Sequence, residues 1–175
     1  MQTALELLKA DHAEVKKLFQ QFERFKKSED DEGMQQVAQK ACKALQVHAQ
    51  IEEEIFYPAL REAADADDAL DEADVEHSHV KELVEQIEGT EPGDELFAAR
   101  VKVLSEYVQH HVDEEESTIF TKARKADFDL VALGQQLETR KAELSGEEPA
   151  ADVDVSALAG RERSQSKRNG QRVKR

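Results

Sequence analysis

The sequence has no tryptophan, one cysteine, three prolines and seven glycines among its 175 residues. The lone Cys42 excludes an intramolecular disulfide, a zinc–thiolate cage and an iron–sulfur site. No run approaches the roughly 18 apolar residues of a membrane span, and the first residues lack the apolar core of a secretory signal. We therefore expect a cytoplasmic protein that has no membrane partner.

The sequence is rich in residues that favour helices. Charged residues make up 36% of the chain and aromatic residues only 5%, a composition that favours helices. The formal net charge of -15 argues against nucleic acid as a partner of the folded part. The charge is uneven, because residues 161–175 hold seven Arg or Lys and one Glu. This basic end is a candidate arm for a protein partner.

Four long segments carry an apolar residue at every third or fourth position, which is typical of helices that pack in a bundle. They cover about residues 3–27, 35–61, 69–88 and 95–124. Each segment has one histidine on its apolar stripe, namely His12, His48, His77 and His111. We expect Pro58 to kink or end the second helix, and Asp94 to be the N-cap of the fourth.

These segments predict an all-α fold, an antiparallel up-down-up-down four-helix bundle. A short fifth helix over residues 128–144 is expected to lie on the bundle, so that the domain covers residues 1–144. From Ser145 the chain turns to Gly, Pro, Ser, Asp and Arg. Residues 145–175 are therefore predicted to be a disordered basic tail.

One stretch of the second segment returns in the fourth. It reads His48-Ala-Gln-Ile-Glu52 and then His111-Val-Asp-Glu-Glu115, and further acid and an apolar pair follow each copy. Residues four apart share one face of a helix. Each copy therefore offers an imidazole and a carboxylate to the same point in space.

The repeat extends to the first and third segments, where Asp11-His12 matches Glu76-His77. Each half of the chain is thus a helix with one histidine, followed by a helix with His-x-x-x-Glu. Two equivalent hairpins would close into the bundle and bring these side chains into one core. Asp11 and Glu76 precede these histidines and either lie in solvent or orient His12 and His77 by accepting hydrogen bonds from them.

Six side chains on the apolar stripes are candidate metal ligands: His12, His48, Glu52, His77, His111 and Glu115. Burial of an unpaired carboxylate costs on the order of several kcal/mol, and no Lys or Arg shares these stripes. Four nitrogens and two carboxylates are too many for one tetrahedral zinc and suit two bridged ions. We prefer iron over manganese because an iron pair with open positions can handle dioxygen or peroxide. A bundle without metal is the alternative.

Other side chains near the stripes have competing interpretations. Tyr107 is either a core residue or reaches a metal. Glu53 and Glu116 lie five residues after the paired histidines and are either solvated, hydrogen-bonded around the site or bridging. His79 is expected at the surface, and His110 either there or beside the site.

The set of motifs resembles the hemerythrin-like family, the HHE cation-binding domain. One histidine, then His-x-x-x-Glu, then both again is the pattern of that family, and the resemblance covers residues 1 to about 124. It implies a four-helix bundle around a non-haem centre of two iron ions. It also implies that the four histidines are terminal ligands and that Glu52 and Glu115 bridge the ions.

The sequence departs from the oxygen-carrying hemerythrins at two places. They have a fifth histidine one turn before the one that matches His77, where this chain has Ala73. Their last carboxylate lies where Glu116 stands, rather than Glu115. One ligand position is thus open, or filled by Tyr107, a second glutamate or water. The change favours a more reactive centre, for example one with catalase-like decomposition of peroxide.

The expected function is a non-haem di-iron protein that binds or processes dioxygen, peroxide or nitric oxide. The alternative is a module for iron binding and storage, or for iron or oxygen sensing, without turnover. A ferritin-like centre is excluded because it needs two Glu-x-x-His motifs, and only Glu76–His79 has that spacing.

Overall fold

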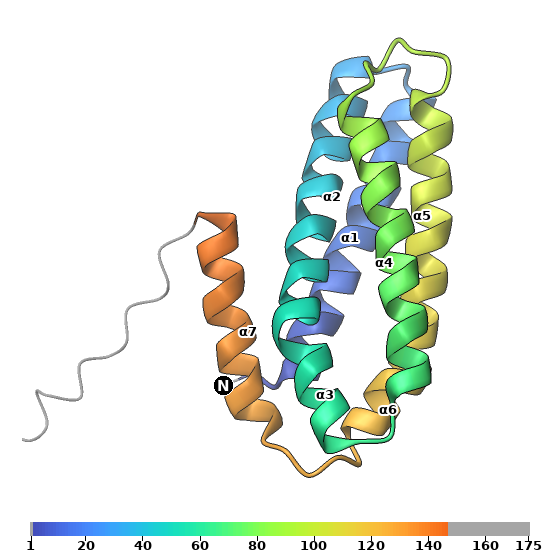
Figure 1. Cartoon of the computed structure of the whole chain (residues 1–175). Helices are drawn as coiled ribbons and strands as arrows, with labels where there is room; N and C mark the ends of the chain where they lie inside the picture. Colours follow the sequence, from blue (N-terminus) through green and yellow to red (C-terminus); the bar gives the residue numbers. More distant parts are fainter. Residues whose placement is uncertain (1, 147–175) are drawn as a thin grey trace, which may run out of the picture.

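The structure is a computed structural model that describes residues 2–146. Seven α-helices make up most of this range: α1 (Ala4–Lys27), α2 (Asp31–Ile51), α3 (Tyr57–Ala63), α4 (Asp67–Glu88), α5 (Phe97–Glu114), α6 (Phe120–Ala123) and α7 (Leu130–Ser145). Two π-helical turns, η1 (Glu52–Phe56) and η2 (Glu115–Ile119), join α2 to α3 and α5 to α6. The bundle consists of four rods, namely α1, α2 continued by η1 and α3, α4, and α5 continued by η2 and α6. These rods lie side by side and antiparallel (Figure 1), which confirms the predicted four-helix bundle.

The helix starts differ in how they are capped. Thr3 begins α1 with a capping box, because its side chain accepts from the N–H of Glu6 and the Glu6 carboxylate accepts from the N–H of Thr3. The prediction for α5 was wrong. Its N-cap is Leu96, and the Asp94 carboxylate instead accepts from the N–H of Glu91 within the preceding turn.

The second rod does not end at Pro58. The Tyr57 N–H donates to the carbonyl of Glu52, five residues earlier, and the rod continues as α3. Pro58 then lies in the first turn of α3, where a missing N–H disturbs least. The extra residue of the π turn shifts the phase of the apolar stripe. Phe56 and Tyr57 are therefore buried, while Ile55, which lies seven residues after His48 and would share its stripe in a regular helix, is only partly buried.

The core consists of two apolar clusters with a polar layer between them. Along α1, Leu8 belongs to one cluster and Val15 to the other, and His12 lies between. Along α4, Ala73 and Val80 have the same relation to the histidine between them. The bundle therefore holds its buried polar side chains at mid-height, closed off by apolar packing on both sides. Among the described residues, no helix is long and apolar enough to cross a membrane.

The fifth predicted helix is α7, which packs against α1, α2 and η1 and covers only one face of the bundle (Figure 1). Asp129 caps it by accepting from the N–H groups of Val131 and Ala132. The helix includes Ser145 and has Gly146 as its C-cap, and these are the first two residues of the predicted tail. Residues 147–175, the remainder of that tail, lie outside the described residues.

Gly134 lets α7 approach the start of the chain closely. A Cβ at this position would lie 2.5 Å from the carbonyl oxygen of Gln2 and 2.8 Å from the backbone nitrogen of Ala4. Backbone atoms cannot move aside as a side chain can. We expect Gly134→Ala to lower the free energy of unfolding by about 1–3 kcal/mol, measured by chemical denaturation. Gly93→Ala is the control, because nothing lies within 4 Å of its Cβ position; equal stability of both variants would contradict the close contact.

Candidate metal centre

The six candidate ligands lie together at mid-height of the bundle and are at most 7% exposed. We call this set the cage: His12, His48, Glu52, His77, His111 and Glu115. It contains two overlapping groups, one of His12, His48, Glu52 and Glu115 and the other of Glu52, His77 and His111. Within each group the candidate ligand atoms lie within 4.8 Å of one another. Since Glu52 belongs to both groups, its carboxylate lies between the two hairpins.

The two histidines of each hairpin bring their Nε2 atoms close together. The Nε2 atoms of His12 and His48 are 3.1 Å apart, and those of His77 and His111 are 3.2 Å apart. A carboxylate oxygen of Glu115 lies 3.1 Å from Nε2 of His12. Each hairpin thus presents two imidazoles to the core, as the repeat in the sequence predicts.

Glu52 contacts both halves. Its Oε2 atom lies 3.3 Å from Nε2 of His48, on the same rod, and 3.4 Å from Nε2 of His77, on α4. Both Glu52 oxygens and Oε2 of Glu115 have no hydrogen-bond partner. Such buried oxygens are rare in folded proteins unless an ion or water satisfies them.

The Nδ1 atom of every cage histidine faces a carboxylate from another helix. The pairs are His12 with Glu116 at 3.0 Å, His48 with Asp11 at 3.5 Å, His77 with Glu53 at 2.9 Å and His111 with Glu76 at 2.7 Å. A carboxylate only accepts, so each Nδ1 carries the proton and donates it. Each Nε2 is then left with a free lone pair that points into the cage.

Two of these contacts correct the expected roles. Asp11 and Glu76 were expected either to lie in solvent or to orient the histidines that follow them. Instead they bond to His48 and His111, on the neighbouring helix of the same hairpin. The reason is helical geometry, because adjacent residues point about 100° apart and do not face each other. Glu53 and Glu116 act across the hairpins in the same way, and at about 30% exposure their side chains are not in the core.

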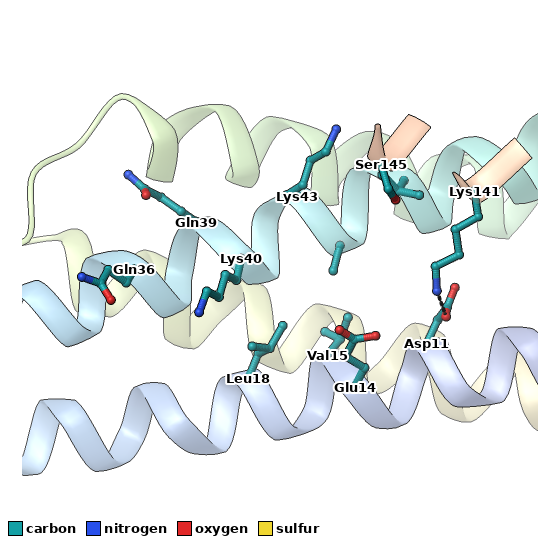
Figure 2. A pocket seen from close by; sticks show the side chains of 12 residues that line it. Asp11, Glu14, Val15, Leu18, Gln36, Gln39, Lys40, Lys43, Lys141 and Ser145 are labelled. Carbon is teal, nitrogen blue, oxygen red and sulfur yellow. Dashed lines mark hydrogen bonds and ion pairs between the residues drawn. The ribbon is translucent and has the colours of Figure 1, made fainter. Parts of the chain in front are cut away.

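We call the four carboxylates that face the Nδ1 atoms the outer carboxylates: Asp11, Glu53, Glu76 and Glu116. Lysine side chains form ion pairs with three of them. Lys9 lies 2.8 Å from Glu116, and Lys81 lies 2.7 Å from Glu53. Lys141 reaches from α7 to Asp11 across a groove of about 720 Å³ between α1, α2 and the end of α7, as Figure 2 shows.

The fourth outer carboxylate, Glu76, has a different neighbour. The Nε2 atom of His110 lies 3.6 Å from Glu76 and 3.4 Å from Glu114, and these three residues form a further, largely exposed group. His110 therefore lies at the surface beside the site. The outer contacts of the two halves are thus not equivalent, because α7 supplies Lys141 to the first half alone.

The two cage carboxylates differ in pKa although both are buried. Burial raises the pKa of Glu52 well above its usual value, and the charge of Glu115 adds to this effect. Burial acts on Glu115 in the same direction, but its contacts with His12 and His111 outweigh burial and lower the pKa of Glu115 to about 2. Burial also lowers the pKa of His48 to about 4. His48 is thus neutral at pH 7, the form that a metal ion binds.

Tyr57 is a site residue that the sequence reading missed. Its hydroxyl donates to Oε1 of Glu115 at 3.4 Å and lies 3.5 Å from Nε2 of His77, and its ring stacks on the His77 ring at 5.6 Å. In the other half Phe120 stacks on His12 at 5.9 Å. Each of these aromatic residues directly follows a π turn. They are also separated by 63 residues, the offset between the two His-x-x-x-Glu motifs, so they occupy equivalent positions in the two halves of the repeat.

Tyr107, in contrast, does not reach the cage. It is 44% exposed and contacts the ring of His79 edge-on at 6.1 Å. The buried stripe of α5 runs instead through Leu104 and Val108, which turns Tyr107 outward. Ala73 is buried in the same apolar cluster as Tyr57, and the tyrosine that contacts His77 is Tyr57 rather than Tyr107.

Comparisons with known proteins agree with this fold. The family model of the hemerythrin HHE cation binding domain matches residues 3–123. A DNA nickase from Nostoc sp. (strain PCC 7120) is 34% identical over 119 residues, which are 68% of this chain but 33% of the nickase. The chain thus spans about a third of the length of that relative.

A solved structure gives the same fold. It is the crystal structure of an HHE cation binding domain-containing protein from Mycobacterium kansasii, with a TM-score of 0.70. The two chains are 23% identical, and the match covers 83% of this chain and 89% of the other. At this identity the likeness extends to the fold alone.

Proposed function

Because the chain belongs to the hemerythrin HHE cation-binding domain family, we propose that the cage holds two iron ions and that the loaded protein binds or processes dioxygen, peroxide or nitric oxide. One observation carries the proposal. Four imidazole lone pairs and two carboxylates converge in a buried layer, and three of the carboxylate oxygens there lack a hydrogen-bond partner. Cations satisfy all of these groups at once.

The donor set supports a pair of ions. His12 and His48 would bind one ion, His77 and His111 the other, and Glu52 and Glu115 would bridge them. Membership of Glu52 in both groups supports the bridging role. Mixed nitrogen and oxygen ligation suits iron, and a closed tetrahedral zinc site needs fewer donors. A bound iron pair supplies redox chemistry and positions at which small oxygen or nitrogen species bind.

The remaining residues prepare the site. The outer carboxylates keep the proton on each Nδ1, which fixes the ring orientation and makes Nε2 a better donor to a metal. The apolar clusters above and below exclude water. Tyr57 adds a hydroxyl to the half that contains His77. The replacement of a histidine ligand by this arrangement favours peroxide decomposition over reversible oxygen carriage.

Metal analysis of protein purified from cells and reloaded with iron tests the proposal. We expect two irons per chain and the near-ultraviolet bands of a bridged iron pair. His77→Ala should lose at least one iron, whereas His79→Ala, at an exposed histidine, should retain both. One zinc per chain without such bands would sink the proposal.

The alternative function is iron storage or sensing without turnover, and the closure of the cage from solvent favours it. It predicts the same iron content and no consumption of peroxide, whereas the leading proposal predicts steady consumption. Stopped-flow oxygen release from the reduced protein separates both from a reversible carrier. The nicking activity named for the longer relative is not proposed here, because the chain spans about a third of that relative and the net charge of -15 argues against nucleic acid as a partner of the folded part.

A further inference from the structure

A pocket of about 290 Å³ lies between α1 and α5 and reaches the cage at His12. We call this pocket the α1–α5 port. Its walls include the small side chains of Ala13 and Ser105. The port is thus a hollow of the surface that touches a proposed metal ligand.

A surface ion pair forms part of the lining of the port beside His12. Lys9 lies 2.8 Å from one oxygen of Glu116, and the other oxygen accepts from Nδ1 of His12 at 3.0 Å. The side chains of Lys9 and Glu116 are 44% and 31% exposed. An ion pair at such exposure is weak, because water competes for both partners. It can open without disturbing the core, and its opening releases one of the two contacts that hold the Glu116 carboxylate beside His12.

The corresponding gap in the other half, between α2 and α4, is bridged. Gln46 on α2 donates to Glu88 on α4 at 3.4 Å. Lys81 on α4 donates to both oxygens of Glu53 at 2.7 Å. Cys42, which the repeat places where Ser105 stands in α5, is 1% exposed and packed in the core. The two sides therefore differ in packing, because Ser105 lines a pocket on the α1–α5 side, whereas its counterpart Cys42 is buried in the core on this one.

We propose that the α1–α5 port is the route by which metal ions and small ligands enter the cage, with the Lys9–Glu116 ion pair as its gate. This inference rests on the proposed metal binding. Asp113 and Glu116 line the port and give an arriving cation two carboxylates before it meets His12. Lys16 also lines the port, so the charges of its lining are balanced and small anions are not repelled.

Uptake of Co²⁺ alone by the metal-free protein tests the port, followed by stopped-flow absorbance. Co²⁺ reports metal entry without any oxygen chemistry. We expect the double variant Ala13→Leu with Ser105→Leu to slow uptake by about tenfold or more, because it fills the hollow. Lys9→Ala should accelerate uptake by about threefold or more, because it releases the gate. Equilibrium affinity for Co²⁺ should stay unchanged in the double variant.

The repeat supplies matched controls. Ser78 occupies on α4 the position of Ala13, so Ser78→Leu should leave the uptake rate unchanged. Lys81→Ala breaks the equivalent ion pair and should not accelerate uptake. Normal affinity with unchanged rates in the double variant and in Lys9→Ala would overturn the port while leaving the proposed function intact. Absence of Co²⁺ binding by the wild-type protein would overturn both. The single variant Ala13→Leu, on an exposed helix position, serves if the double variant does not fold.

Discussion

Glu52→Gln should make the metal-free protein more stable and prevent it from binding two metal ions. The side chain is fully buried, and neither of its oxygens has a hydrogen-bond partner. Burial raises its pKa well above the usual value, so folding without metal forces the carboxyl to take up a proton. An amide of the same shape needs no proton. We expect the free energy of unfolding of the metal-free protein to rise by about 2 kcal/mol near pH 8.

The pH dependence of this gain follows from the direction of the shift. A carboxyl whose pKa is raised by folding binds an extra proton in the folded state. Its contribution to stability is complete below the unfolded pKa of about 4.5 and is lost as pH rises toward the folded pKa. The advantage of Glu52→Gln should therefore be small at pH 4 and grow with pH.

Chemical denaturation at several pH values, together with metal titration, checks this expectation. Glu72→Gln, at an exposed position of α4, is the control and should change neither stability nor metal content. With metal present, the wild-type protein should become more stable than Glu52→Gln. A ligand at about a thousand times its Kd adds about 4 kcal/mol to the free energy of unfolding, and only the wild-type protein gains this amount. A Glu52→Gln protein that is less stable without metal, or that still binds two ions, would refute the assignment of Glu52 as a bridge.

Tyr57→Phe should remove the visible absorption of the iron-loaded protein without removing its iron. Burial, with the charges of Glu52 and Glu115, raises the pKa of Tyr57 well above its usual value, so the hydroxyl stays protonated when no metal is bound. A ferric ion in the cage would displace that proton, and an iron–phenolate pair absorbs in the visible range. Loss of one buried hydrogen bond should lower stability by only about 1 kcal/mol.

The sequence offers a clean control for this measurement, since the chain has two tyrosines. The other, Tyr107, is exposed and contacts His79 rather than the cage. Iron-loaded Tyr107→Phe should keep the spectrum of the wild-type protein. A visible band that persists in Tyr57→Phe and disappears in Tyr107→Phe would restore the interpretation made from the sequence.

The rods and most of the cage geometry were predictable because helical periodicity reports burial directly. On α4 the predicted stripe through Leu70, His77 and Val84 is the buried face observed. A histidine on such a stripe must enter the core, and the duplication shows that four of them do so at one level. The same reasoning gave α1 and α7 within two residues.

The effect of a π turn on which residues are buried could not be predicted from the sequence, because such a turn contains one extra residue. Helical periodicity assumes 3.6 residues per turn, whereas η1 and η2 each contain a π turn. The stripe therefore changes phase after Glu52, which buries Tyr57 and leaves Ile55 at the edge. The repeat does indicate that Tyr57 and Phe120 are equivalent residues, because the position of Tyr57 relative to His48 equals that of Phe120 relative to His111.

The contacts between different helices are the second feature that could not be predicted from the sequence. The pairing of Asp11 with His48, rather than with the adjacent His12, depends on how two helices face each other. The ion pair of Asp11 with Lys141 spans 130 residues, and no local pattern indicates it. Long side chains at the surface of one helix meet another only after packing is fixed, so these partners follow from the tertiary structure alone.

The repeated hairpin suggests how such a chain can arise. One hairpin supplies two histidines and one cage carboxylate, half of the donors, and so cannot surround a pair of ions by itself. Two identical hairpins around a two-fold axis would supply the full set. The present chain has the arrangement that duplication and fusion of a gene for such a self-associating peptide would produce. Once both copies share one polypeptide, each can change alone, and the tyrosine at position 57 opposite the phenylalanine at position 120 is a difference that no symmetric homodimer can have.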